Sequence, residues 1–141
     1  MPTLYEQALV ELRARLTALP GLGPAGVMRG DAFTPEREQV PAIDIADGDL
    51  LPTPDKCADC WILKGTPQVR ITALSESARD ALLNAAVASF KLPWPGGLGL
   101  CRLYIRGVNY RRGGQDKTAF TVVVQLEFSL SCKAFDLSAP S

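Results

Sequence analysis

The sequence predicts an α+β domain, in which a mainly antiparallel four-stranded sheet carries two helices on one face, in the order helix, two strands, helix, two strands (αββαββ). Segments 3–19 and 75–90 repeat apolar residues at helical spacing. Segment 120–132 alternates apolar and polar residues, which is typical of a strand covered on one side only. With 141 residues, 47% of them hydrophobic, we expect a single domain over residues 1–141 with a packed core.

The first helix is predicted over residues 3–19. Its apolar residues recur three or four positions apart, and Thr3 stands where an N-cap is expected. Pro20 and Gly21 end the pattern. We expect a short strand in the following segment AGVMRGD.

The second strand is predicted in QVPAIDIA, residues 39–46. Because Pro41 has no N–H to give to a ladder, we place this strand at an edge of the sheet. Residues 47–66 contain two prolines and two glycines, and we interpret them as a loop-rich insert. The segment QVRITA, residues 68–73, then alternates with Val69, Ile71 and Ala73 on one face, which predicts the next strand.

The second helix is predicted in SESARDALLNAAVASF, residues 75–90. Ser75 or Ser77 is suited to cap it, and alanine and leucine, which favour helix, fill its body. The segment LPWPGGLG ends it, because it contains two prolines and three glycines.

The C-terminal third predicts a long β-hairpin. Its last strand places alternate residues from Phe120 to Cys132 on the apolar face. Its partner is CRLYIRGVNY, residues 101–110, with Cys101, Leu103 and Ile105 inward and Arg102, Tyr104 and Arg106 outward. If the hairpin turns near Gly113 and Gly114, Cys132 lies opposite about residue 96.

The pair Cys57 and Cys60 forms a Cys-x-x-Cys motif in a chain with four cysteines and no histidine. Zinc would need a second pair of ligands within ~2.3 Å of the ion. In the expected register Cys101 and Cys132 lie about 16 Å apart, at ~3.3 Å per residue, so they do not supply half of such a site. A redox motif should follow a strand and open a helix. We interpret the motif as part of a loop with Trp61 and Ile62 turned inward, and expect neither metal nor cofactor.

The chain offers no readable catalytic constellation. Without histidine there is no Ser-His or Cys-His pair. Asp44, Asp47 and Asp49 lack the glutamate of a calcium loop, and the glycine-rich segments do not match a phosphate-binding signature. We therefore expect a protein that is not an enzyme.

Charge predicts one local patch and no global attraction to nucleic acid. Fifteen basic and fifteen acidic residues cancel. The patch comprises Arg102, Tyr104, Arg106, Tyr110, Arg111, Arg112 and Lys117. It is open to three interpretations: a solvated strand face and hairpin tip, a contact with a protein, or a contact with DNA. No apolar run approaches the ~18 residues of a membrane span, so we expect a soluble protein with no membrane partner.

The order of these segments resembles the tail terminator (tail-tube completion) proteins of long-tailed bacteriophages along nearly the whole chain. The resemblance is carried by the N-terminal amphipathic helix, VMRGD, QVPAIDIADGD, QVRITALSESARDALLNAAVASF, LGLCRLYIRGVNY and TAFTVVVQLEFSLS. The insert with Cys57 and Cys60 departs from the family pattern.

The resemblance implies a structural virion protein that forms a homohexameric ring on the last ring of the major tail tube protein. Such a ring stops tube polymerisation and presents the surface that joins the head-tail connector or neck protein, and DNA meets it only in passing through. It implies a place in the virion tail, at the head-proximal end, for a protein made in the host cytoplasm. The alternatives are a neck or head-completion connector, or a small metal- or nucleic-acid-binding module.

Overall fold

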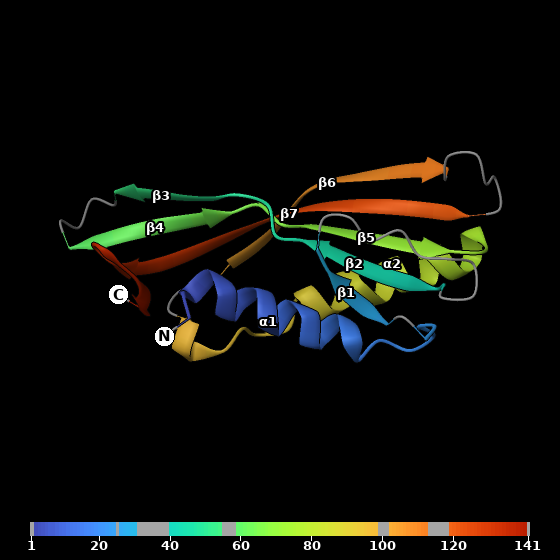
Figure 1. Ribbon diagram of the computed structural model, residues 1–141, viewed down its shortest axis with the longest axis horizontal. Coiled ribbons are helices and arrows are strands. Elements are labelled where there is room, and N and C mark those ends of the chain that lie inside the picture. The colour runs from blue at the N-terminus through green and yellow to red at the C-terminus, as the bar shows by residue number, and fades with distance from the viewer. Residues whose placement is uncertain are drawn as a thin grey trace.

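The computed structural model describes residues 2–24, 26–30, 40–54, 59–98, 102–112 and 119–140. It confirms the α+β class and the placement of both helices on one face of the sheet (Figure 1). The expected four-stranded sheet is wrong, because the sheet has eight strands. The elements are α1 (Leu4–Thr17), β1 (Val27–Arg29), β2 (Ala42–Ala46), β3 (Leu50–Pro54), β4 (Cys60–Gly65), β5 (Gln68–Ala73), α2 (Glu76–Phe90), a 3-10 turn (Gly96–Leu98), β6 (Arg102–Arg112), β7 (Phe120–Lys133) and β8 (Asp136–Pro140).

Both helices begin at the caps that the sequence predicts. The Thr3 hydroxyl accepts a hydrogen bond from the Glu6 N–H, and the Ser75 hydroxyl accepts one from the Ala78 N–H, each at 3.1 Å. Each bond satisfies a donor that the first helical turn leaves without an intrahelical partner. The caps therefore fix where each helix begins.

The long strand β7 is the centre of the sheet. Along one side it pairs with β5 through residues 120–125 and with β4 through residues 128–133. Along its other side it pairs with β6 and β8. All pairings are antiparallel except that of β1 with β2, so the mainly antiparallel sheet and the long C-terminal hairpin are confirmed.

The expected loop-rich insert at 47–66 contains a hairpin instead. Strands β3 and β4 pair from Leu50 opposite Gly65 to Pro54 opposite Trp61, and they reach past the helices at one end of the molecule (Figure 1). Prolines within β3 are tolerated because β3 is an edge strand and needs donors on one side only. Proline and glycine predict a loop locally, but pairing with β4 and β7 makes the segment part of the sheet.

The expected edge position of the QVPAIDIA strand is also wrong. Strand β2 lies between β1 and β5, and its residues Ala42, Ile43, Asp44 and Ile45 are all buried. Pro41 precedes β2, so its missing N–H costs no ladder bond. The pattern that predicted the strand was correct, and its position was decided by the short parallel strand β1.

The apolar face of β7 forms part of the core as expected, with Val122, Val124, Leu126, Phe128, Leu130 and Cys132 buried. The opposite face was expected to be open to solvent along its length. It is half-buried from Gln125 to Ser131, but Thr121 and Val123 are buried as well. The expectation of a sheet covered on one side only is therefore wrong near the start of β7.

Two glycines allow neighbouring groups to approach the backbone closely, one between β2 and β3 and one at the end of β4. Gly48 has a φ of +67°, and a Cβ there would overlap the backbone of Thr66. A Cβ at Gly65 would overlap the ring of Tyr5, which α1 packs against the sheet. These approaches hold the β3–β4 hairpin against the body of the domain.

Candidate assembly surface

The predicted patch lies mostly on β6, but the expected hairpin register is wrong. Arg102 pairs with Ser129 and Arg112 with Phe120, and a β-bulge lies between Ile105 and Gly107. Cys132, expected opposite residue 96, pairs with Trp61 of β4 and Pro140 of β8. The expected turn at Gly113 and Gly114 lies outside the described residues, and the bulge shifts the register by one further residue.

The bulge divides the patch between the two faces of the sheet. Before it, Arg102 and Tyr104 lie opposite Ser129 and Glu127 on the face away from the helices, here called the outer face. Beyond it, Val108 and Tyr110 pair with core residues of β7 and so lie on the helix side. Arg111 is again on the outer face.

Arg106, at the bulge, is held on the outer face by its own strand and by β7. Its Nε donates to the Glu127 carboxylate at 3.0 Å, and its guanidinium lies 5.0 Å from the centre of the Tyr104 ring. The charge of Arg106 is thus offset within the chain. Arg112 ends β6, and Lys117 lies outside the described residues.

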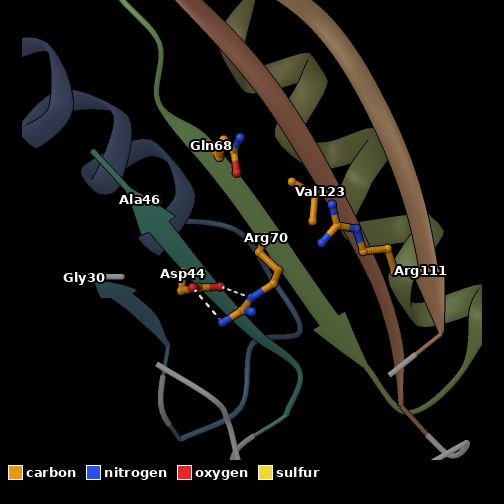
Figure 2. A pocket seen from close by; sticks show the side chains of 7 residues that line it. All are labelled: Gly30, Asp44, Ala46, Gln68, Arg70, Arg111 and Val123. Carbon is orange, nitrogen blue, oxygen red and sulfur yellow. Dashed lines mark hydrogen bonds and ion pairs between the residues drawn. The ribbon is translucent and has the colours of Figure 1, made fainter. Parts of the chain in front are cut away.

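A polar depression of about 140 Å³ opens on the outer face beside Arg111 (Figure 2). Asp44 is buried there and accepts two hydrogen bonds from the Arg70 guanidinium, at 2.8 and 2.9 Å. Arg111 reaches toward Val123 from the other side. The lining residues are Gly30, Asp44, Ala46, Gln68, Arg70, Arg111 and Val123. The depression is shallow, and its buried acid is already offset by an arginine.

Tyr110 is held from the helix side. The Arg79 guanidinium of α2 lies 4.7 Å from the centre of its ring and also pairs with Asp80 at 3.0 Å. Glu76, Arg79, Tyr110 and Arg111 line an open hollow between the start of α2 and the end of β6. This end of the molecule therefore offers arginines and a tyrosine ring, residue types that are enriched at protein interfaces.

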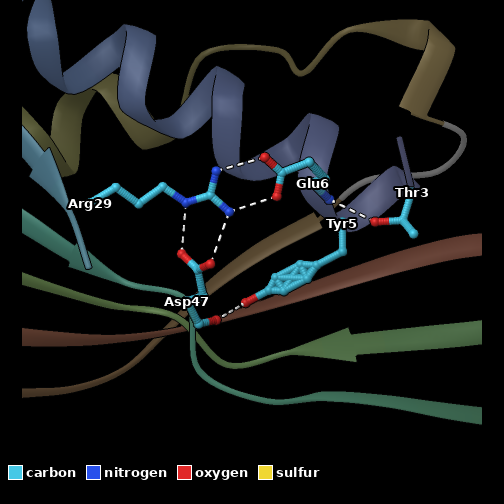
Figure 3. A network of polar contacts seen from close by, with 5 residues as sticks. All are labelled: Thr3, Tyr5, Glu6, Arg29 and Asp47. Atoms are coloured by element: carbon cyan, nitrogen blue, oxygen red, sulfur yellow. Dashed lines mark hydrogen bonds and ion pairs between the residues drawn. The ribbon is translucent and has the colours of Figure 1, made fainter. Parts of the chain in front are cut away.

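The sequence pattern did not reveal a polar network that joins α1 to the sheet (Figure 3). Arg29 of β1 donates to both carboxylate oxygens of Glu6 at 2.6 Å and to Asp47 at 2.7 and 3.0 Å. The hydroxyl of Tyr5 donates to the backbone oxygen of Asp47. Hydrogen bonding to Arg29 lowers the pKa of Glu6, while burial, with the nearby Asp47 charge, raises the pKa of Tyr5.

The two described cysteines lie on neighbouring strands at the same end of the sheet. Cys60 begins β4 opposite Lys133, and Cys132 is fully buried, which raises the pKa of its thiol. Cys57 and Cys101, the other two candidate zinc ligands, lie outside the described residues. Within the described ranges no three side chains of the metal-ligating types gather, and the absence of metal stays a prediction.

Comparison with solved structures finds the same fold in an assembled particle. A chain from the structure described as "Virion of native gene transfer agent (GTA) particle" superposes with a TM-score of 0.57. The match covers 92% of this chain and 92% of that one, at 15% sequence identity. The fold is that of a chain in a virion particle. No family model matches this sequence, and no curated protein matches it.

At this identity the comparison bears on fold alone. The match extends over nearly the full length of both chains. Within the described ranges no helix has the length and apolar character needed to cross a membrane.

Proposed function

We propose that this chain is a structural virion protein that forms a ring at the head-proximal end of a phage-type tail tube. The observation that carries the proposal is the fold shared over 92% of both chains with a component of a gene transfer agent virion. The order of the sequence segments, which resembles that of tail terminators, supports the same role. The proposed role is non-catalytic and needs no cofactor.

The proposed partners are further copies of this chain in a homohexameric ring, the major tail tube protein and the head-tail connector or neck protein, with DNA passing through. A ring suits this role because a head-to-tail contact that closes limits growth, whereas an open one makes filaments. We place the contacts with the other virion proteins on β6 and the end of its hairpin, with Arg102, Tyr104, Arg106, Tyr110 and Arg111, joined by Arg112 and Lys117.

The test is a particle that lacks this protein. Heads should fill with DNA, while tails should be longer than normal or fail to join heads in negative-stain images. Adding back the purified chain should cap the tubes and restore joining. A variant with Arg111→Glu and Arg112→Glu should melt like the wild type, because charge changes near a hairpin end affect folding little, yet fail to restore joining.

Each outcome separates the proposed role from its alternatives. Tails of normal length that fail to join heads would assign the chain to a neck or head-completion connector. Tails of normal length that join normally would remove the virion role altogether. A monomer in dilute solution does not count against a ring, because the tube end holds several copies close together and raises their effective concentration.

A further inference from the structure

The edge of β6 that faces away from β7 is the longest edge without a partner among the described strands. β6 is 11 residues long and pairs with β7 alone. Such an edge presents a row of N–H and C=O groups that are ready to pair with another chain.

The direction of the backbone groups follows from β7. The N–H of Leu126 donates to the carbonyl of Pro67 at 3.0 Å, on the side of β4 and β5. Backbone groups alternate sides along a strand, so the odd-numbered residues of β7 are turned to β6. They pair with Arg102, Tyr104, Gly107, Asn109 and Arg111. The backbone groups that point away from β7 are therefore those of Leu103, Ile105, Val108 and Tyr110.

The same residues carry apolar side chains on the helix side, where the helices leave them open. Ile105 is 42% exposed, Val108 38% and Tyr110 59%. Exposed residues scattered singly need no explanation, but these lie on one face of one strand that has an open edge. A strand added at this edge would satisfy their backbone groups and cover their side chains together.

The described strands of a second copy do not suit this edge. β1 has three residues and β8 has five, which makes each too short to cover it. β3 carries Pro52 and Pro54, and the alternation traced from Leu126 turns both positions outward, so neither offers an N–H there. Two β6 edges would place Arg102 and Arg111 of both copies along one seam, where like charges repel.

We propose that β6 accepts an extended, acidic strand from a different protein of the particle, which adds to the sheet beside it. The inference rests on the proposed role in the virion and names the mode of contact and the chemistry of the partner. Arg102 and Arg111 lie on the outer face near the two ends of β6, and neither takes part in an ion pair within the described residues. The partner strand carries acidic side chains facing them and apolar side chains facing Ile105 and Val108.

Amide hydrogen exchange at single-residue resolution tests the mode of contact, on the isolated chain and on purified particles. In the isolated chain the outward amides of Ile105 and Val108 should exchange freely, while that of Asn109, bonded to β7, should be slow. In the particle the outward amides should slow by at least about tenfold, because they become hydrogen-bonded. Outward amides that stay fast in particles containing the chain overturn strand addition and leave the proposed function standing. Absence of the chain from the particle removes the proposed function, and this inference with it.

A proline variant isolates the backbone contribution. Val108→Pro removes an N–H that points away from β7, so the free chain should keep its fold, whereas Val108→Thr keeps the N–H and the branched shape. Incorporation into particles should fall at least about tenfold for Val108→Pro, because the added strand loses a backbone hydrogen bond to β6. Incorporation of Val108→Thr should stay normal. Normal incorporation of Val108→Pro contradicts the inference.

Charge variants provide a second test, which holds even if the Val108→Pro variant fails to fold. Arg102→Glu with Arg111→Glu should fold normally and lose incorporation, whereas Arg102→Lys with Arg111→Lys should retain it. Normal incorporation of the Glu pair contradicts an acidic partner. Cross-linking within particles then identifies the neighbour of β6. A strand of another protein supports the inference, and a second copy of this chain overturns it.

Discussion

Val124 occupies the middle of β7, with its side chain fully buried beneath the helices. A carboxylate there would be buried without a partner, which costs several kcal/mol. We expect Val124→Asp to lose most of the stability of the domain, or more than about 4 kcal/mol in urea denaturation, since small domains total only ~5–15 kcal/mol.

The control for this substitution has to come from further along the strand, because Val123 is buried too. Ser129 is half-buried on the outer face, between Lys64 of β4 and Arg102 of β6. Ser129→Asp places its charge beside two cations, and its effect should stay within about 1 kcal/mol. Equal losses for Val124→Asp and Ser129→Asp would contradict the assigned faces of β7.

Between elements, the ion pairs of Arg29 tie α1 to β1 and to the segment that follows β2. Because Arg29 holds the pKa of Glu6 below its usual range, this contact stabilises the fold above the ordinary glutamate pKa of about 4.3 and is lost as the pH falls through the lowered value. The melting temperature of the wild type should therefore exceed that of Glu6→Gln near pH 7, and the difference should shrink as the pH falls below the ordinary glutamate pKa.

The background variant Arg29→Gln supplies the control for this linkage. Without the guanidinium, Glu6→Gln should change the melting temperature little at any pH, because the contact that lowers the pKa of Glu6 is gone. Thermal melts of the wild type and the three variants, from pH 7 to well below the ordinary glutamate pKa, complete the cycle. A constant difference between wild type and Glu6→Gln across this range would remove the proposed linkage.

Over the whole molecule, β7 joins the body of the domain to the β3–β4 hairpin, since it pairs with β5 near its start and with β4 near its end. If either part unfolds alone, half of β7 loses its partner on that side, so we expect a single cooperative transition. Trp61 reports on the hairpin, where it lies 4.8 Å from the ring of Phe135, and Trp94 reports on the body, 5.0 Å from Phe128.

Single-tryptophan variants test this expectation. Trp61→Phe leaves Trp94 as the fluorophore, and Trp94→Phe leaves Trp61. Within each variant, the fluorescence and circular dichroism midpoints in urea should coincide, as for a two-state domain. A hairpin signal that disappears at lower urea than the circular dichroism signal would show that the two parts unfold separately.

The sequence predicted what depends on near neighbours. Thr3 and Ser75 were found because a cap and the helix it starts are adjacent in the chain. The core residues of β7 were found because alternation is a local property of a strand. The strands β3 and β4 were missed because Pro52 and Pro54 predict a loop unless a neighbouring strand is already known.

By itself, then, the sequence determined the two helices, the long alternating strand and the α+β class, because these are set by local propensity and periodicity. The balance of charge follows from the composition alone. Only the tertiary structure decided the division of the β6 residues between two faces, because a bulge exists only relative to a partner strand. It also decided the network of Glu6, Arg29 and Asp47, whose members lie 18 and 23 positions apart in the chain. Pairing across such distances depends on the register of the whole sheet, and no short stretch of sequence contains that information.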